Sequence, residues 1–316
     1  MGGVKMRLEL LFPIHLRETM KNLEKLQDLE EIRVRIGQPL FFYTGQKELV
    51  LLLKEKQDKK GQFRNSRELG TNDNVYHVTE ADLLEMQNYI SNYSLYAWQE
   101  ELRNGFLTIQ GGHRIGLAGG TTNQNGRISG ISYLTFFNIR VAHERVGCAG
   151  KILPYIWNHN TLIVSPPGAG KTTLLRDCIR SLSYEGMKIG LVDERSEIAA
   201  CYHGIPQNDV GPRTDVLDGC NKSEGIVMLL RTMSPAVIAV DELGIEDDFK
   251  AVEQAAYCGC KIIGTVHAGS MKEIQEKPVL NKWCEKELFE RFVFIKKGES
   301  GMRECNVYNQ RWELLC

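Results

Sequence analysis

Residues 161–177 read TLIVSPPGAGKTTLLRD. The β-branched and apolar residues at the start predict a strand, the prolines and glycines predict a loop, and a helical pattern follows. In this order, the N–H groups of the loop and the positive end of the helix face one hollow. The stretch therefore predicts a phosphate-binding site.

Individual residues of this loop have separate expected roles. Lys171 is expected to reach the β- and γ-phosphates, and the Thr172 hydroxyl is expected to bind Mg²⁺. The match to G-x-x-x-x-G-K-[ST] is incomplete because Ser165 replaces the first glycine, and the following prolines are expected to set the turn instead. The alternative is a turn that happens to carry a lysine. The expected nucleotide contacts are Pro167, Gly168, Ala169, Gly170, Lys171, Thr172 and Thr173.

Composition restricts the class of protein. The 316 residues suffice for two domains, and 39 Lys+Arg against 40 Asp+Glu give no global field that attracts nucleic acid or anionic lipid. The longest apolar run, at residues 49–53, is far shorter than the roughly 18 residues of a membrane-spanning helix. We therefore expect a soluble protein, peripheral to a membrane at most. Nine irregularly spaced cysteines favour buried free thiols in a reducing cytoplasm over a zinc site.

We predict a smaller α+β domain at residues 1–148, without a catalytic constellation of its own. Helices are expected within 8–29, interrupted at Pro13, and from the capping pattern Thr79-x-x-Asp82 to about Arg103. The polar residues 54–74 predict a solvated hairpin extension or a flexible insert. Strands are expected at 31–36, 39–43, 47–53, 106–110, 113–118, 127–132 and 135–141, with turns at the glycine pairs 111–112 and 119–120.

Residues 149–316 are predicted to form a P-loop domain with a mainly parallel sheet and helices on both faces, because strands and helices alternate. Ligands of such sheets collect at the carboxyl ends of the strands. Three strands after the loop end in polar side chains, at Asp193, at Asp241-Glu242 and at His267. Residues 206–222 are expected to be a long loop, and the tail from Arg291 to Tyr308 a β-hairpin that caps the sheet.

Roles follow from phosphoryl transfer, which needs positioning and charge neutralisation. Asp241 is expected to hold Mg²⁺ through a water, and Glu242 to orient or deprotonate the attacking water. His267, with Thr265, lies where a γ-phosphate sensor is expected, or it is a hydrogen-bonded histidine at a strand end. Asp193, Glu194 and Glu197 form a second acidic cluster, suited to positioning water or to salt bridging.

Arginines supply a further expectation. Arg213 has the loop position of a finger that acts across a subunit boundary, although it also suits an ordinary surface arginine. Arg114, Arg140 and Arg145, with His113 beside them, are either solvent-facing or directed at a nucleotide, including that of a neighbouring subunit.

These motifs together resemble the stage III sporulation AA family of endospore-forming bacteria, which is related to the hexameric ATPases of type II and type IV secretion and pilus retraction. Besides the phosphate loop, the resemblance rests on EEIRVRIGQPL (30–40), SLYAWQEELRNGFLTIQGGHRIGLAG (94–119), LVDERSEIAA (191–200), VGPRTDVLDGC (210–220), LLRTMSPAVIAVDELG (229–244) and GTVHAGS (264–270).

This resemblance implies a RecA-like P-loop core in which Lys171 and Thr172 are the Walker A pair and Asp241 and Glu242 the Walker B pair. It places Asp193, Glu194 and Glu197 in the acidic box of the secretion ATPases, with Glu197 a catalytic candidate, and His267 in their histidine box. The sequence departs from the pattern at Ser165 and in the order of the acidic residues, which leaves open which carboxylate acts.

The resemblance also implies Mg²⁺-dependent ATP hydrolysis that assembles or powers a secretion-like channel between mother cell and forespore. The expected partners are further copies of the chain, as a homo-hexamer, and membrane-embedded channel proteins contacted from the cytoplasmic side. Three alternatives are an ATPase associated with nucleic acid, a small-molecule kinase, and a nucleotide-gated scaffold with little turnover. The chain has no basic tract interleaved with aromatic residues, so no stable nucleic-acid binding is expected.

Overall fold

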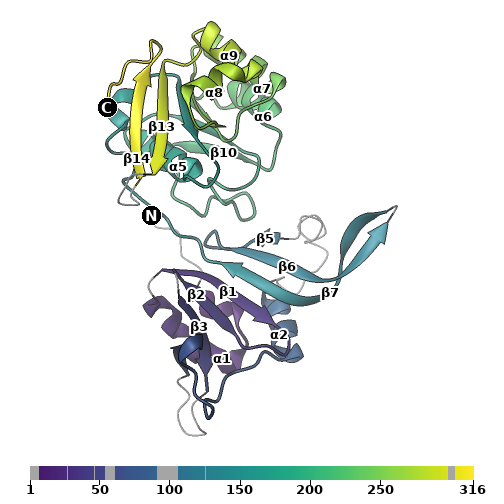
Figure 1. Cartoon of the computed structure of the whole chain (residues 1–316). Helices are drawn as coiled ribbons and strands as arrows, with labels where there is room; N and C mark the ends of the chain where they lie inside the picture. Colours follow the sequence, from purple (N-terminus) through teal and green to yellow (C-terminus); the bar gives the residue numbers. More distant parts are fainter. Residues whose placement is uncertain are drawn as a thin grey trace. The chain divides into compact units, whose positions relative to one another are not determined.

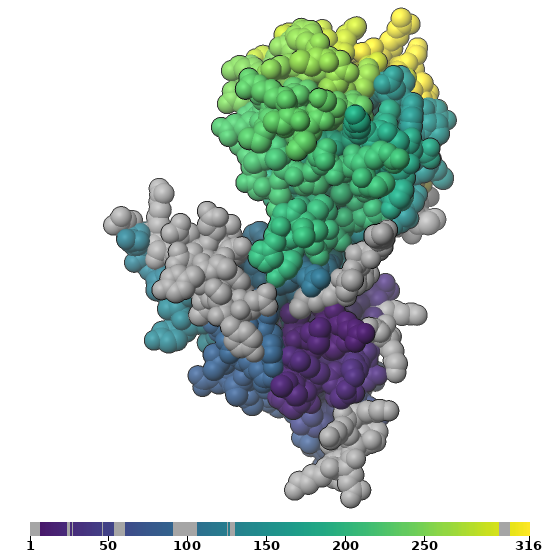
Figure 2. Space-filling model, turned by 180° about the vertical axis from the view of Figure 1, so that it is seen from behind, coloured from purple at the N-terminus to yellow at the C-terminus, as the bar shows by residue number. Residues whose placement is uncertain are grey.

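The computed structural model describes residues 7–26, 28–45, 47–53, 61–90, 106–124, 126–297 and 303–316. The chain divides into two compact units, Met1–His143 and Glu144–Cys316 (Figure 1). The boundary expected after Cys148 thus falls inside the second unit. Figure 2 shows the surface of the chain from the opposite side, in the same colours by residue number. Within the described ranges, no helix is both long and apolar enough to cross a membrane.

The first unit is a sheet with helices on one face. Its described strands lie in the order β4-β3-β2-β1-β7-β6-β5, and neighbours are antiparallel. Alternate residues such as Ile32 and Val34 enter a core shared with Leu16 and Met86 of the helices. The elements are η1 (Leu8–Leu11), α1 (Ile14–Met20), η2 (Lys21–Lys25), β1 (Leu29–Arg35), β2 (Phe41–Thr44), β3 (Lys47–Leu52), β4 (Gln62–Asn65), η3 (Ser66–Glu68), α2 (Glu80–Ile90), β5 (Phe106–Thr108), β6 (Arg114–Gln124) and β7 (Arg127–Arg140).

Helix α2 begins at the predicted capping pattern. The Asp82 carboxylate accepts hydrogen bonds from the backbone N–H and the hydroxyl of Thr79, whose hydroxyl oxygen accepts one from the Asp82 N–H. This reciprocal arrangement satisfies donors at the start of a helix that lack partners within it. The expected continuation to Arg103 lies outside the described residues.

Two predictions for this unit are wrong. The glycine pair 119–120 is not a turn; it lies inside β6, where the register with β7 shifts, and the two strands expected over 127–141 are the single strand β7. Glycine marks a bulge there as readily as a turn. The polar residues 54–74 are in part regular: residues 62–65 form β4, which pairs with β3, as the hairpin alternative required. Residues 54–60 lie outside the described residues.

The second unit is a mainly parallel sheet between helices. Its described strands lie in the order β10-β9-β11-β12-β8-β13-β14, and only the β13–β14 pair among them is antiparallel. The bounds are α4 (Leu153–Ile156), β8 (Thr161–Ser165), α5 (Lys171–Tyr184), β9 (Ile189–Asp193), β10 (Thr214–Asp218), α6 (Lys222–Thr232), β11 (Val237–Val240), α7 (Glu246–Tyr257), β12 (Lys261–His267), α8 (Met271–Glu276), α9 (Pro278–Glu285), β13 (Arg291–Lys297) and β14 (Arg303–Asn309).

Both faces of this sheet are buried, as expected for parallel strands. On one face, residues such as Ile238 and Val240 pack against α6, α7 and α9; on the other, Val237 and Ala239 pack against α4 and α5. The four residues of β11 are therefore all buried although their side chains alternate. This explains the unbroken apolar runs of the sequence, and the α/β prediction is confirmed.

The expected long loop at 206–222 is wrong in part, because it contains β10 at the sheet edge. An edge strand has only one paired neighbour, and the exposed Asp215 and Asp218 hide its strand character in the sequence. The terminal hairpin is confirmed: β14 pairs with β13, and β13 pairs in parallel with β8. Of the nine free cysteines, Cys148, Cys258 and Cys316 are exposed, contrary to the expectation of buried thiols.

Candidate functional site

The ends of four neighbouring strands meet at one edge of the second sheet. Strands β9, β11, β12 and β8 are adjacent and parallel. Val240, the last residue of β11, pairs with Val192, and His267, at the end of β12, pairs with Ser165 at the end of β8. The groups that follow these strands therefore lie side by side, where open α/β sheets bind ligands.

The phosphate loop connects β8 to α5 and requires its glycines. Gly168 and Gly170 have φ values of 75° and 96°, in the left-handed region that favours glycine. Helix α5 begins at Lys171, so its unpaired N–H groups point toward the loop. These residues can thus cradle an anion without a glycine at Ser165.

Lys171 lies at the centre of the site and is only 5% exposed. Its Nζ donates to the backbone oxygens of Ser165, at 3.1 Å, and Pro166, at 3.2 Å, and lies 2.9 Å from His267 Nδ1. Burial lowers the pKa of this ammonium, while the carboxylates of Asp241 and Glu242 act in the opposite direction. The ammonium is thus held among acceptors at the mouth of the loop.

Thr172 and Asp241 are in direct contact. The Thr172 hydroxyl donates to Asp241 Oδ2 at 2.8 Å, and Asp241 Oδ1 accepts hydrogen bonds from the Thr265 hydroxyl and, at 3.1 Å, from the Glu242 N–H. Mg²⁺ at nucleotide sites takes one or two protein oxygens and completes its shell with water and phosphate. The hydroxyl–carboxylate pair fits this requirement.

Glu242 is held on both carboxylate oxygens. Its Oε1 lies 3.1 Å from His267 Nε2, and its Oε2 lies 2.9 Å from Arg195 Nη1. Because the Lys171 ammonium can only donate, His267 Nδ1 accepts from it, and Nε2 carries the proton that it gives to Glu242. The Glu242 backbone has φ 53°, a strained conformation for this residue type and one that clusters at functional sites.

The acidic segment after β9 divides into residues with different surroundings. Asp193 is buried, and its carboxylate accepts hydrogen bonds from the N–H groups of Glu197, Ile198 and Ala199. Burial raises the pKa of the Asp193 carboxyl, against the effect of those N–H donors. Glu194 forms an ion pair with Lys222 at 2.6 Å. Asp193 therefore organises the turn that follows β9.

A small cavity joins this segment to the end of β11. The lining residues are Asp193, Glu194, Arg195, Glu197, Lys222, Asp241 and Glu242. Arg176 of α5 also donates to the backbone oxygens of Glu197, at 2.7 Å, and Ile198, at 2.6 Å, which ties the phosphate-loop helix to the acidic turn. The two acidic clusters expected from the sequence are thus neighbours.

The structure does not bring Arg213 to this site. It precedes β10, whose first residue pairs with Ile189 at the start of β9. Arg213 therefore lies at the amino-terminal ends of the strands, opposite the carboxyl ends that form the site. Its backbone N–H donates to Ser183 Oγ at 2.7 Å, and its guanidinium donates to the Ser183 backbone oxygen at 3.0 Å. A catalytic role for Arg213 therefore requires a second copy of the chain.

The remaining arginines are placed within their own units. Arg140 lies 3.5 Å from Glu31, and the Arg114 guanidinium lies over the Phe106 ring at 5.0 Å; both residues belong to the first unit. Arg145 is exposed in the second unit. His113 is buried and accepts a hydrogen bond from the Ala142 N–H, which is a structural role.

Two residues of the site were not found from the sequence. Arg195 belongs to the acidic segment, but only the fold shows that its partner is Glu242, and Arg176 lies within a helix as an apparently ordinary charged residue. The signal for Arg195 was a cation inside a run of carboxylates. A cation at that position could equally pair with the carboxylates next to it in the chain, so the sequence alone did not point to Glu242.

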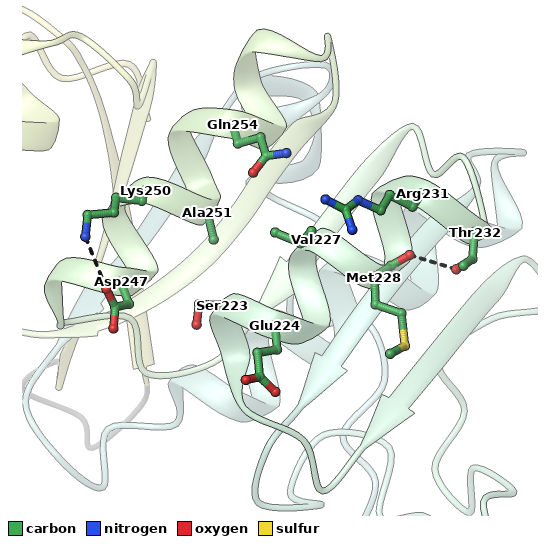
Figure 3. Close-up of a pocket in the computed structure, with 10 residues that line it drawn as sticks. All are labelled: Ser223, Glu224, Val227, Met228, Arg231, Thr232, Asp247, Lys250, Ala251 and Gln254. Carbon is green, nitrogen blue, oxygen red and sulfur yellow. Dashed lines mark hydrogen bonds and ion pairs between the residues drawn. The ribbon is translucent and has the colours of Figure 1, made fainter.

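A separate cavity of about 520 Å³ opens between α6 and α7 (Figure 3). Val227, Met228 and Ala251 contribute apolar surface, and Glu224 and Arg231 lie on the α6 side. Because Lys171 and Asp241 do not line it, this cavity is not the phosphate hollow.

Comparisons with known proteins identify the family of the chain. The model of the family described as "Sporulation stage III, protein AA" matches residues 5–315. The stage III sporulation protein AA of Bacillus subtilis (strain 168) is 37% identical over 315 residues, covering 95% of this chain and 95% of that protein.

Solved structures of ATPases share the fold. The Legionella pneumophila ATPase DotB has a TM-score of 0.58 at 14% identity, covering 93% of this chain and 80% of that one. The pilus retraction motor PilT, determined with bound ADP, has a TM-score of 0.57 at 13% identity, covering 92% and 81%. At these identities the likeness shows the fold alone, and it confirms the RecA-like prediction. With a family match over nearly its whole length, this chain belongs to the stage III sporulation protein AA family.

Proposed function

We propose that the protein is a Mg²⁺-dependent ATPase of the secretion-motor type, which hydrolyses ATP to ADP and phosphate. The observation that carries this proposal is the direct contact of Lys171, Thr172, Asp241, Glu242 and His267 at the carboxyl edge of one sheet. These are the groups that phosphoryl transfer needs: a cation for the phosphates, ligands for a metal, and a base for water.

Each group has a task in this reaction. The loop N–H groups bind the phosphates, and Lys171 exchanges its contacts with loop carbonyls for the β- and γ-phosphates. Thr172 and Asp241 would hold Mg²⁺, which supplies charge neutralisation to the phosphates. Glu242 orients the attacking water and accepts its proton, while His267 holds the carboxylate of Glu242 in place. Glu197 remains a candidate for water positioning from the neighbouring turn.

The Lys171→Ala substitution tests nucleotide binding. It removes the buried cation, so the affinity for Mg·ATP should fall by at least about thirty-fold. Calorimetric titration of the purified full chain with ATP measures this. Lys250→Ala, which removes an exposed lysine of α7, is the control and should bind as the unmodified protein does. Equal affinity of the Lys171→Ala variant and the unmodified protein would contradict the proposed site.

The Glu242→Gln substitution separates binding from hydrolysis. Affinity for Mg·ATP should be retained, while phosphate release should fall about 10²- to 10⁴-fold because the general base is lost. Phosphate release is measured with and without single-stranded DNA. Turnover that requires DNA would favour the nucleic-acid alternative, and binding without turnover in the unmodified protein would favour the nucleotide-gated scaffold.

The cellular role is the widest part of the proposal. Membership of a sporulation family with the fold of secretion and pilus ATPases supports a role in assembling or powering a secretion-like channel during endospore formation. We place the protein in the cytoplasm of the mother cell, at the membrane facing the forespore, with membrane-embedded channel proteins as partners. We propose that it acts as a homo-hexamer in which Arg213, which lies away from the site of its own chain, serves the site of a neighbouring copy.

A further inference from the structure

We propose that Arg195 is a positioning residue that clamps the carboxylate of Glu242, and that a nucleoside triphosphate must release this clamp before Glu242 can orient water. This inference rests on the proposed function and assigns its site a restraint that favours ADP over ATP.

Two side chains hold the carboxylate of Glu242, one on each oxygen. Arg195 binds Oε2 at 2.9 Å and His267 binds Oε1 at 3.1 Å. The side chain of Glu242 is only 27% exposed, whereas that of Arg195 is 64% exposed. The carboxylate is therefore fixed by the protein, and the guanidinium reaches it from the solvent side of the turn after β9.

His267 couples the clamp to the phosphate loop. Its Nδ1 accepts from Lys171 Nζ at 2.9 Å, so Lys171, His267, Glu242 and Arg195 form one continuous chain of contacts. Lys171 cannot keep its contacts with His267 and two loop carbonyls while it donates to the β- and γ-phosphates, because an ammonium has three protons. When the phosphates take the place of the two loop carbonyls, Lys171 keeps one proton for His267, which stays oriented toward Glu242.

The ion pair with Arg195 is then the contact that Glu242 must give up. A carboxylate whose oxygens are both engaged by cationic or N–H donors is poorly directed toward a water, so catalysis requires Glu242 to leave Arg195. ADP has no γ-phosphate beside which a water must be oriented, and its binding leaves the Arg195–Glu242 pair intact. The pair should thus weaken ATP binding selectively.

The test compares Arg195→Ala, Arg195→Lys and the unmodified full chain. Affinities for Mg·ADP and for a non-hydrolysable Mg·ATP analogue are measured by calorimetry. Arg195→Ala should bind the analogue about two- to five-fold more tightly, the range expected for one partly exposed ion pair, with ADP affinity unchanged. Arg195→Lys keeps the charge without the planar fork and should lie between the two. Arg231→Ala, which removes an exposed arginine of α6, is the matched control.

A double-mutant cycle shows whether the effect acts through Glu242. In a Glu242→Ala chain the added Arg195→Ala substitution should change neither affinity, because the clamp is already absent. Weaker analogue binding by Arg195→Ala would mean that Arg195 contacts the triphosphate itself, and an unchanged ATP-to-ADP preference would make the pair a surface salt bridge. Either result overturns the clamp alone. Absence of ATP binding by the unmodified protein would overturn the proposed function as well.

Discussion

At the scale of single residues, the acidic side chains of the site differ in what surrounds them. Asp241 and Glu242 face hydroxyl, imidazole and guanidinium groups, whereas the Asp193 carboxylate accepts backbone N–H groups inside its own turn. A carboxylate that satisfies backbone donors stabilises structure. One that contacts the residues around the phosphate loop is a candidate for the proposed reaction.

Asp193→Ala should therefore destabilise the protein. Each buried N–H left without an acceptor costs about 1–3 kcal/mol, so a loss of at least about 3 kcal/mol is expected in the free energy of unfolding. Denaturant unfolding measures it. The exposed pair of Asp247 with Lys250 gives the control, since Asp247→Asn should change stability by less than about 1 kcal/mol. An Asp193→Asn protein with full stability and no turnover would instead make Asp193 catalytic.

The meeting of Lys171, Asp241, Glu242 and His267 was predictable, because each lies at or after the end of a strand whose apolar run is plain in the sequence, and parallel strands end at one edge. The partner of Arg195 was not. A long exposed side chain reaches several neighbours, and which one it binds depends on the positions of two loops in space. The same reason left Arg213 undecided, since a loop residue's distance from the site is set by the sheet order.

At the scale of elements, the β6–β7 pair depends on one glycine. A Cβ on Gly119 would lie 1.6 Å from the backbone oxygen of Tyr133, whereas one on Gly116 of the same strand would come no closer than 3.6 Å to its nearest neighbour, Asn138 Cβ. The bulge at this point lets the two backbones approach closely.

Gly119→Ala should weaken the first unit by about 1–3 kcal/mol, the range for overpacking, and leave affinity for Mg·ATP unchanged. Thermal unfolding followed by circular dichroism, together with a nucleotide titration, measures both quantities. Gly116→Ala is the control and should be nearly neutral. Equal melting temperatures of the two variants would show that the two strands move apart to admit the added methyl group at little cost in stability.

Elements that were predicted well from the sequence have a strong apolar pattern, and those that were missed do not. Strands β8, β9 and β11 are continuous buried runs. Strand β10 is charged and partly exposed, and its existence depends on β9 lying beside it, which is a tertiary effect. The glycine pair in β6 was misread because local sequence does not distinguish a bulge from a turn.

At the scale of the whole molecule, the role proposed for Arg213 would make the activity a property of an assembly, because Arg213 lies away from the site of its own chain. The Lys171→Ala and Arg213→Ala chains should each be inactive, the first through its own site and the second through its neighbour's. Mixing them should restore phosphate release to about a quarter of that of the unmodified protein, because one interface in four pairs an intact site with an intact arginine.

Activity of the unmodified protein should also rise more than linearly with its concentration, as subunits associate. Full activity of the Arg213→Ala chain alone would remove this arginine from the reaction. Arg114, Arg140 and Arg145 would then be tested in the same mixing experiment. A specific activity that is independent of concentration would indicate that one chain is sufficient.

The strand that leads into the phosphate loop pairs with two strands that come much later in the sequence. Strand β8 ends at Ser165, but it pairs with β12, which begins at Lys261, and with β13, which begins at Arg291. During synthesis the ribosome must therefore deliver most of the remaining polypeptide before this strand acquires either neighbour. The nascent chain carries the complete phosphate-loop sequence long before it has a pocket for a phosphate, so the proposed ATPase activity cannot begin until translation is nearly finished.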